Sequence, residues 1–344
     1  MQGSRKDLAP VATDAPTVWA SADFIDRASW TFELSPPEQR VITDYGQNPS
    51  DLDLRGALED VASRWLDVLV AGPGFLLLRG FPVHELTPEQ TEVAYLALGR
   101  LVGTLVGQDR KGSLTTHIRD ERLPAGPGVR KYQTNQSQNF HSDASDIVGL
   151  LCLHPAKSGG SSRIISTHAV YNEMLQHDPY LTGLLFEPFP WSRHTEQRPG
   201  ESPYFELAPI AFVRGTPRVS IIPWFIRQSQ AHPTAPRLSS EQLAALDLME
   251  YVMSSPELQV VMDFGPGDVQ FLNNTTVLHA RDAYEDYDDP ALRRHLIRLW
   301  LTMESPVAED ILSGQTDIGG AYATTCATGA SRFLGRRPPH HDRL

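Results

Sequence analysis

The spacing of apolar residues along the chain predicts several helices. Apolar side chains recur every three to four residues from Leu54 to Leu69, and the segment AGPG at 71–74 ends that pattern. A threonine cap followed by a first-turn proline, Thr87-Pro88, marks the start of a second helix. The predicted helices cover residues 52–70, a run that begins at 88, a stretch near 168–187, and residues 239–254.

A second pattern, short apolar runs bounded by turn residues, predicts strands that dominate the later part of the chain. The predicted strands are FLLLRG at 75–80, IVGLLCL at 147–153, AFVRG at 211–215, RVSII at 218–222, LQVVMDF at 258–264, DVQFL at 268–272, TTVLHA at 275–280 and HLIRLWLTM at 295–303. Strand and helix do not alternate regularly, and no internal repeat is present. The pattern therefore favours an α+β or β-sandwich architecture over a parallel sheet.

The two ends of the chain differ from the middle in composition. Residues 1–20 and those from about 319 onward are polar, basic or rich in Pro, Gly and Ala. We expect a loose N-terminal segment at 1–20, a single domain at 21–318 and a flexible C-terminal tail at 319–344. A length of 344 residues would also accommodate two average domains, so length alone does not decide the number of domains.

The charge and the cysteines exclude several classes of protein. The formal charge is −12, and the basic residues are scattered rather than arranged in a stripe, so nucleic acid is not expected as a partner. No apolar run approaches the roughly 18 residues that span a bilayer, and the start lacks the apolar core of a secretory signal. Cys152 and Cys326 are too few for a disulfide framework or a thiolate zinc site. We expect a soluble, cytoplasmic protein that binds a small molecule, and the sequence does not indicate its oligomeric state.

Candidate chemistry begins with His141 and Asp143, which stand two positions apart just before the strand at 147–153. Side chains on a strand alternate sides, so we expect His141 and Asp143 to project from the same face, about two rises of roughly 3.3 Å apart, where both could bind one ion. Asp146 lies an odd number of positions from His141 and would face the other side, so it is the weaker candidate. Alone, such a pair is more often structural.

A later segment raises the interest of this pair. His279 closes an apolar strand, and the next strand carries Arg294 and Arg298 on one face. Two histidines and one carboxylate form the facial set that binds non-haem Fe(II) and leaves coordination positions open. The same set also suits a hydrolytic zinc ion, although that alternative leaves the arginine strand unexplained.

Five motifs occur in one order along the chain: HSD at 141–143, SGGSS at 158–162, GPGDVQFLNN at 265–274, LHARDAYED at 278–286 and RRHLIRLWL at 293–301. Together they resemble the taurine dioxygenase (TauD/TfdA-like) family of Fe(II)- and 2-oxoglutarate-dependent oxygenases, from about residue 75 to about 303. The resemblance implies a double-stranded β-helix, or jelly-roll, core with flanking helices. That fold is compatible with the α+β pattern but is not demanded by it.

The resemblance also implies roles for particular residues. The implied catalytic iron ligands are His141, Asp143 and His279. Arg294 would bind the distal carboxylate of 2-oxoglutarate through a planar fork that lysine cannot reproduce, and Ser162 aligns with a family hydroxyl that contacts the same carboxylate. Arg298 would meet the co-substrate or an anionic group of the substrate.

Plainer interpretations stay open for several of these residues. Ser162 could cap a turn, and Arg298 could form an ion pair with one of the acids at 285–289. Four aromatic residues could line a pocket or fill a core, and we expect at least half of them to be core. They are Trp191, Tyr204, Phe205 and Trp224.

The implied reaction uses Fe(II), 2-oxoglutarate and O2. Decarboxylation to succinate and CO2 would accompany oxidation of an unactivated C–H bond in a small polar or carboxylate-bearing molecule. Hydroxylation is the expected outcome, and desaturation or ring formation could use the same residues. Halogenation needs the carboxylate ligand to be absent, so Asp143 argues against it. Outside the enzymes, a non-catalytic jelly-roll module could bind a small acid through Arg294 and Arg298.

Overall fold

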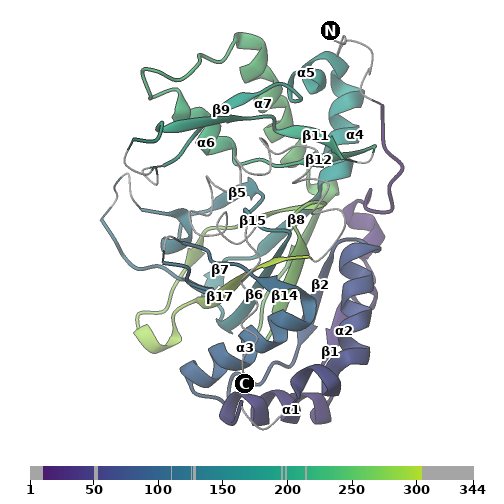
Figure 1. The fold of residues 1–344 in the computed structure, drawn as a ribbon, viewed down its shortest axis with the longest axis vertical. Helices are drawn as coiled ribbons and strands as arrows, with labels where there is room; N and C mark the ends of the chain where they lie inside the picture. The colour runs from purple at the N-terminus through teal and green to yellow at the C-terminus, as the bar shows by residue number, and fades with distance from the viewer. Residues whose placement is uncertain are drawn as a thin grey trace, which may run out of the picture.

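The computed structural model of the chain describes residues 11–49, 53–109, 111–124, 126, 129–194, 197, 200–213 and 215–303. Two mainly antiparallel sheets lie at the centre of this part of the chain. Long helices cover one face of the larger sheet, and a lobe of helices and hairpins lies over the smaller sheet (Figure 1). The α+β class predicted from the sequence is confirmed.

The larger sheet has the strand order β1-β2-β14-β6-β17-β3, and β4 pairs with β17. Its strands are β1 (Thr31–Glu33), β2 (Phe75–Arg79), β3 (Thr104–Leu105), β4 (Thr115–Ile118), β6 (Ile147–His154), β14 (Val269–Asn273) and β17 (His295–Thr302). Strand β2 is buried on both faces: Leu76 and Leu78 pack against the helices, whereas Phe75 and Leu77 pack toward the smaller sheet. Burial on both faces explains why this strand is a continuous apolar run.

The smaller sheet has the order β13-β8-β15-β5. Its strands are β5 (Gln138–His141), β8 (Ser162–Ser166), β13 (Gln259–Met262) and β15 (Val277–Arg281). Three strand pairs complete the β structure: β7 (Ser158–Gly159) with β16 (Tyr284–Glu285), β9 (Phe189–Ser192) with β10 (Tyr204–Leu207), and β11 (Ile210–Val213) with β12 (Thr216–Val219).

Three helices cover the outer face of the larger sheet (Figure 1). They are α1 (Pro36–Gln47), α2 (Leu54–Val70) and α3 (Pro88–Val102). The predicted end of α2 at Val70 and the predicted start of α3 at Pro88 are confirmed, and the Thr87 hydroxyl caps α3 by accepting a hydrogen bond from the Gln90 N–H at 3.3 Å. Helix α2 begins at Leu54, two residues after the predicted start. Short 3-10 helices occur at η1 (Ser21–Phe24), η2 (Arg27–Ser29), η3 (Lys131–Gln133), η4 (Pro256–Leu258) and η5 (Pro290–Leu292).

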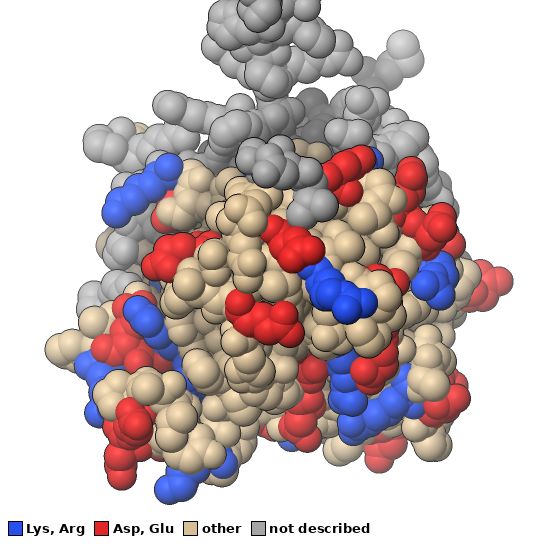
Figure 2. Space-filling view, turned by 90° about the horizontal axis from the view of Figure 1, so that it is seen from below, with Lys and Arg blue, Asp and Glu red and all other residues tan. Residues whose placement is uncertain are grey.

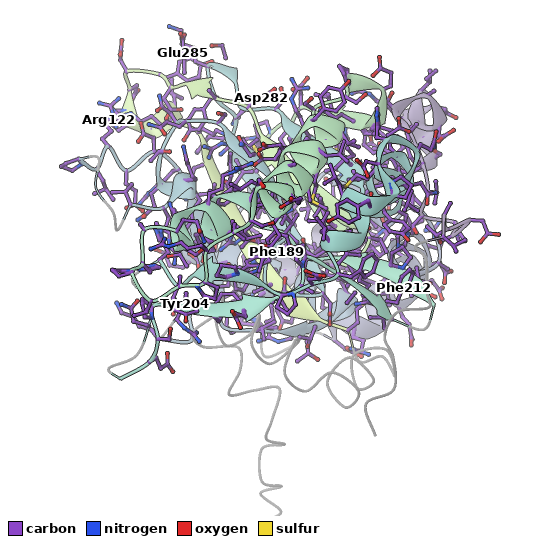
Figure 3. The ribbon with its side chains drawn as sticks, turned by 90° about the horizontal axis from the view of Figure 1, so that it is seen from above. Arg122, Phe189, Tyr204, Phe212, Asp282 and Glu285 are labelled. Atoms are coloured by element: carbon purple, nitrogen blue, oxygen red, sulfur yellow. The ribbon has the colours of Figure 1, made fainter. Side chains whose placement is uncertain are left out.

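The described residues between 167 and 253 form an upper lobe over the smaller sheet (Figure 1). Its helices are α4 (Thr167–His177), α5 (Pro179–Leu184), α6 (Pro223–Ser229) and α7 (Ser240–Met253). The single stretch predicted near 168–187 is two helices, because Pro179 cannot continue α4 and the Asp178 carboxylate caps α5. Figure 3 looks down on this lobe, with Phe189 near its middle and Tyr204 and Phe212 toward its edges.

The N-terminal segment that we expected to be loose is anchored between residues 11 and 20. The Tyr171 hydroxyl donates to the Val11 carbonyl at 3.1 Å, the Asn172 side chain bonds Thr13 twice, and the Trp19 indole donates to Pro73. This part of the chain therefore ties the upper lobe to the core. Residues 1–10 and the predicted tail at 319–344 lie outside the described residues.

The length of the helices and the distribution of surface charge concern two possible partners, a membrane and a nucleic acid. In the described part of the chain, no helix is both long and apolar enough to span a membrane. On the face seen in Figure 2, the acidic and basic side chains that the structure describes are interspersed, without a continuous basic stripe.

Candidate active site

His141, Asp143 and His279 lie together between the two sheets. Their ligand atoms all lie within 4.8 Å of one another, and all three side chains are buried. The Nε2 atom of His141 is 3.9 Å from Asp143 Oδ1, and the Nε2 atom of His279 is 3.8 Å from Asp143 Oδ2. One carboxylate and two imidazole nitrogens thus point at a common centre.

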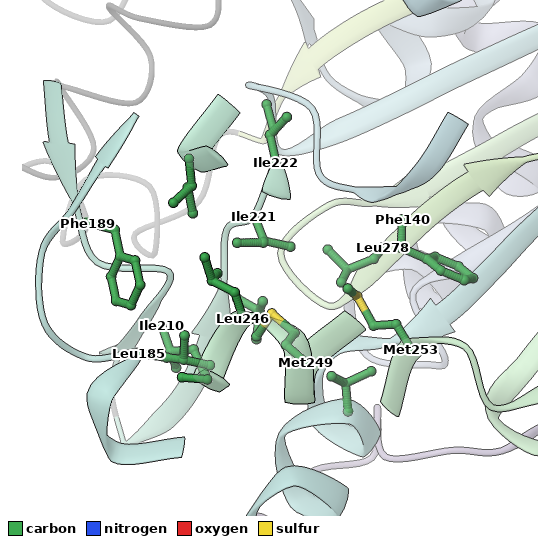
Figure 4. Close-up of a cluster of buried hydrophobic side chains, with 14 of the residues drawn as sticks. Phe140, Leu185, Phe189, Ile210, Ile221, Ile222, Leu246, Met249, Met253 and Leu278 are labelled. Carbon is green, nitrogen blue, oxygen red and sulfur yellow. The ribbon is translucent and has the colours of Figure 1, made fainter. Parts of the chain in front are cut away.

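The pairing of β5 with β15 positions the two histidines. His141 and His279 are direct cross-strand partners, and their ring centroids are 4.2 Å apart. Because side chains alternate along a strand, Phe140 and Leu278 point to the opposite face, where they join the apolar core of the upper lobe (Figure 4). The lobe therefore buries one face of this strand pair, and the histidines occupy the other face.

Asp143 reaches the cluster by a different route from the one we expected. Strand β5 ends at His141, so the two residues do not share a strand face, and that premise is wrong. Instead the chain turns at Ser142, whose N–H donates to Ile221 O at 3.0 Å and whose hydroxyl accepts from Ile221 N at 3.1 Å. Asp146 stays apart, as predicted, and its carboxylate accepts from Met303 N at 3.0 Å.

Asp143 is held by two donors from β17. Arg298 Nη1 lies 3.1 Å from Asp143 Oδ2, and the Trp300 indole donates to the same oxygen at 3.0 Å. Burial alone would raise the pKa of the Asp143 carboxyl, but Arg298 and the two histidines together lower it below its usual value. The alternative of an ion pair between Arg298 and the acids at 285–289 is wrong for the described residues.

Both histidines of the cluster are neutral near pH 7. Burial lowers the pKa of the His279 imidazole to about 3, and the nearby His141 adds to the shift; burial also lowers the pKa of His141. The Nδ1 atom of His141 lies 2.9 Å from the Asn139 carbonyl, which places the ring proton on Nδ1 and the lone pair on Nε2. The Gln138 side-chain amide lies 2.9 Å from that Nε2. Neutral imidazoles and an ionised carboxylate fit a divalent iron ion.

A small cavity of about 40 Å³ adjoins the cluster. Its polar lining is Gln138, His141, Ser162, His279, Arg281, Arg294 and Arg298, and Ile118, Leu150, Phe264 and Leu296 contribute apolar surface. The cationic groups of this lining come from β15, from the residue immediately before β17 and from β17 itself. The cavity therefore offers a positive end beside the histidine and carboxylate ligands.

Arg294 lies immediately before β17 and is 4% exposed. Its guanidinium carbon lies 5.0 Å from the centre of the Tyr284 ring, and its Nη1 is buried without a hydrogen-bond partner in the described structure. Burial lowers the pKa of Arg294. Gly160, at φ +74°, allows this packing, because a Cβ there would lie 3.1 Å from Arg294 Nε.

Ser162 opens β8 and faces the same cavity. Its hydroxyl donates to Gln270 Oε1 at 3.1 Å, so the interpretation of Ser162 as a turn cap is wrong. The structure thus places Ser162, Arg294 and Arg298 around one cavity beside the cluster, as well as a residue that the sequence analysis missed.

That residue is Arg281, which is 8% exposed. It stands two positions after His279 on β15, so the same alternation that places the histidine also directs Arg281 inward. Burial lowers the pKa of Arg281 to about 10, and Arg294 adds to the shift. In the motif LHARDAYED, Arg281 resembles an ordinary charged residue at the end of a strand. Its spacing of two from His279 could have predicted that both side chains lie on the same face of the strand.

A larger cavity of about 420 Å³ also borders the cluster, at His141 and Asp143. Tyr132, Gln138, His141 and Arg298 line both cavities. Trp224 also lines the larger one, and its ring lies 5.3 Å from that of His141. Trp191 and Phe205, in contrast, are core residues of the upper lobe, which confirms that at least half of the four aromatic residues fill a core.

The fold and the site define a jelly-roll oxygenase with a two-histidine, one-carboxylate cluster, and the comparisons agree. The sequence matches the Taurine catabolism dioxygenase TauD, TfdA family over residues 34–300, and the chain belongs to that family. It is therefore an enzyme of the class that uses Fe(II), 2-oxoglutarate and O2, and the predicted family, enzyme class and cofactors are confirmed.

Two curated relatives show how far the similarity extends. FR-33289 synthase from Streptomyces rubellomurinus (strain ATCC 31215) is 34% identical over 310 residues, and the match covers 84% of this chain and 90% of the relative. Taurine hydroxylase-like protein SAT17 from Stachybotrys chartarum (strain CBS 109288 / IBT 7711) is 28% identical over 240 residues, 66% of this chain and 60% of the relative.

Solved structures confirm the fold. An asparagine oxygenase in complex with Fe(II), 2S,3S-3-hydroxyasparagine and succinate matches with a TM-score of 0.61 at 16% identity, over 83% of this chain and 96% of that one. The non-heme iron oxygenase OrfP in complex with Fe and alpha-ketoglutaric acid matches with a TM-score of 0.57 at 17% identity, over 82% and 96%. At these identities the likeness supports the jelly-roll fold expected from the sequence.

Proposed function

We propose that this dioxygenase hydroxylates an unactivated C–H bond of a small polar or carboxylate-bearing molecule while 2-oxoglutarate is converted to succinate and CO2. The observation that carries the proposal is the buried cluster of His141, Asp143 and His279 between two adjoining cavities. One cavity has a cationic end suited to a dicarboxylate, and the other is large enough for a second small molecule.

In this proposal His141, Asp143 and His279 hold Fe(II). The ion, when bound, supplies the site at which O2 and 2-oxoglutarate react to oxidise the substrate. The protein keeps the two imidazoles neutral by burial and the carboxylate ionised through Arg298, so all three ligands are ready to coordinate. With Asp143 present, hydroxylation is favoured over halogenation.

Arg294 and Ser162 are the proposed binding residues for the distal carboxylate of 2-oxoglutarate. Both line the small cavity with His279, and Arg294 has a buried donor without a hydrogen-bond partner in the described structure. A guanidinium binds a carboxylate through two parallel hydrogen bonds, which fixes the direction of the acid as well as its position. The keto end of the molecule would then point back toward the ligand cluster.

The larger cavity is the proposed substrate site. It borders Asp143 and carries Arg298, whose Nε donates to Gln108 at 2.8 Å and whose guanidinium packs on the Trp300 ring at 4.6 Å. Arg298 can therefore present positive charge to an anionic substrate group or to the co-substrate. The similar oxygenases have been solved with hydroxyasparagine and (3S)-hydroxy-L-Arg, and we propose a substrate of comparable size.

Anaerobic addition of Fe(II) and 2-oxoglutarate to the purified protein tests this proposal. A visible charge-transfer band of the metal chelate is expected with the intact chain, and no band with His279→Ala. The exposed His177 of α4 gives a matched control, and His177→Gln should retain the band. If the intact chain gave no band, the ligand assignment would be overturned. Product mass separates the outcomes: hydroxylation adds one oxygen atom, whereas desaturation or cyclisation removes two hydrogens.

A further inference from the structure

Two buried arginines meet at the end of the small cavity. Arg281 is 8% exposed and Arg294 is 4% exposed, and each guanidinium carbon lies 5.0 Å from the centre of the Tyr284 ring. Neither forms an ion pair with a carboxylate of the described residues. Two like charges packed against one ring and shielded from water are costly unless an anion joins them.

The hydrogen-bonding groups of Arg281 divide into two sets. Its Nη2 donates to main-chain carbonyls of the segment 131–136: to Thr134 at 2.9 Å, and also to Lys131 and Gln136. Its Nε and Nη1 are buried and make no hydrogen bond in the described structure. Arg294 Nη1 is likewise buried and makes no hydrogen bond in the described structure. Both arginines line the small cavity, and each thus has buried donors without a hydrogen-bond partner in the described structure.

We propose that Arg281 is a second arginine of the co-substrate site, which binds the distal carboxylate of 2-oxoglutarate together with Arg294. The proposal rests on the proposed function. A carboxylate has two oxygens with about four acceptor positions, enough to accept from a guanidinium on each side. Arg281 is the last residue of β15 and Arg294 immediately precedes β17, so the two guanidinium groups that line the cavity come from different segments of the chain.

The second set of contacts gives Arg281 a further role as a positioning residue. The segment that its Nη2 holds contains η3, and Lys131 and Tyr132 of η3 line the larger cavity. One side chain therefore spans from the co-substrate carboxylate to a wall of the substrate site. Once the distal carboxylate fixes the guanidinium, the 131–136 segment is fixed with it, so co-substrate binding completes the substrate cavity.

A comparison of two 2-oxo acids tests the proposal. We would measure the dissociation constants of 2-oxoglutarate and of 2-oxopentanoate, which lacks the distal carboxylate, by calorimetry with the anaerobic Fe(II) protein. Arg281→Gln should weaken 2-oxoglutarate about 10- to 100-fold, since hydrogen bonds to a charged group are lost, and should leave 2-oxopentanoate nearly unchanged. Arg163→Gln is the matched control: that arginine pairs with Asp282 outside both cavities, and its loss should change neither constant.

Several outcomes would overturn the assignment. Unchanged 2-oxoglutarate affinity in Arg281→Gln would remove Arg281 from the site, and an equal loss for both acids would reduce it to a support for the 131–136 segment. If Arg281→Gln does not fold, Arg281→Lys gives the same comparison, because it keeps the charge and loses the fork. Hydrogen exchange should show that 2-oxoglutarate protects 131–136 in the intact chain but not in the variant. Failure of the intact chain to bind 2-oxoglutarate would instead overturn the proposed function itself.

Discussion

The guanidinium of Arg298 lies 3.1 Å from the carboxylate of Asp143, the one acidic residue of the cluster. The sequence analysis predicted that Arg298 would bind an anionic group of the co-substrate or the substrate. In the structure it contacts a carboxylate of the protein itself, that of Asp143. Trp300, two residues further along β17, donates to the same oxygen. The two side chains fix the direction in which Asp143 points, so β17 helps to build the ligand cluster although it carries no ligand.

Trp300→Phe should weaken Fe(II) binding. The variant keeps an aromatic ring beside Arg298 and removes the N–H donated to Asp143, and loss of such an outer hydrogen bond typically costs about 10- to 100-fold in metal affinity or activity. Titration of the apo protein with Fe(II) under anaerobic conditions measures the effect. Trp191→Phe, which removes an indole bonded to Leu207 in the upper lobe, should leave Fe(II) affinity intact. Equal affinities in the Trp300 variant and the wild type would contradict the role of this contact.

Arg294→Gln should raise the dissociation constant of 2-oxoglutarate about 10- to 100-fold, because a charge-assisted pair with the distal carboxylate is lost. Arg294→Lys should restore little of it, since an ammonium group cannot form two parallel bonds. Its neighbour Arg293 donates only to the main-chain carbonyls of Tyr287 and Asp288 at the surface, so Arg293→Gln is the control. A similar loss in both variants would indicate a general effect of charge.

Gly160→Ala should reduce both stability and 2-oxoglutarate affinity. The residue has φ +74°, and an added Cβ would lie 3.1 Å from Arg294 Nε and 3.2 Å from the Tyr284 side chain. Backbone strain alone costs about 1 kcal/mol, and displacement of Arg294 adds a loss of binding. Gly215 has φ +80° with nothing within 4 Å, so Gly215→Ala should show the strain without the binding defect. Chemical denaturation and calorimetry together separate the two effects.

His295 should lower the free energy of unfolding in mild acid. Burial lowers its pKa to about 4, and neighbouring His117 and Arg119 contribute, so the unfolded chain binds more protons than the folded chain between that value and the ordinary pKa near 6.5. Stability is therefore present above about pH 6.5 and is lost as the pH falls toward 4. Relative to His295→Gln, the wild type should lose about 1 kcal/mol between about pH 7.5 and pH 5.5 in urea unfolding. If the free energy of unfolding changed equally with pH in the wild type and in His295→Gln, this role of His295 would be disproved.

The sequence predicted the elements that carry strong local signals. Helices α2, α3 and α7 and strands β2, β6, β14, β15 and β17 are where apolar spacing and caps placed them. Helix α1 was missed, although Ser35, Pro36 and Glu38 form a capping box and a first-turn proline before it. Its apolar positions are few, because only one side of the helix packs against α2 and α3.

The candidate site was predictable where motif and geometry coincide. His279 is far in sequence from His141 and Asp143, and the residue types together with the motif order of the family joined it to that pair. The contact between Arg298 and Asp143 could not be predicted from the sequence, because it depends on where β17 lies beside the turn that follows β5. Arg281 needed one further step, namely that a residue two positions from a ligand on the same strand shares its face.

The pairing of His141 with His279 has a consequence for how this strand pair can change. Side chains alternate, so a slip of one residue between β5 and β15 would carry Phe140 or Leu278 to the ligand face and a histidine into the apolar core of the upper lobe. The same register is thus selected by two independent requirements, apolar burial and ligand placement. The pair tolerates an irregular register between His279 and Arg281, but a shift of one residue at His141 or His279 itself would lose both the apolar burial and the ligand placement.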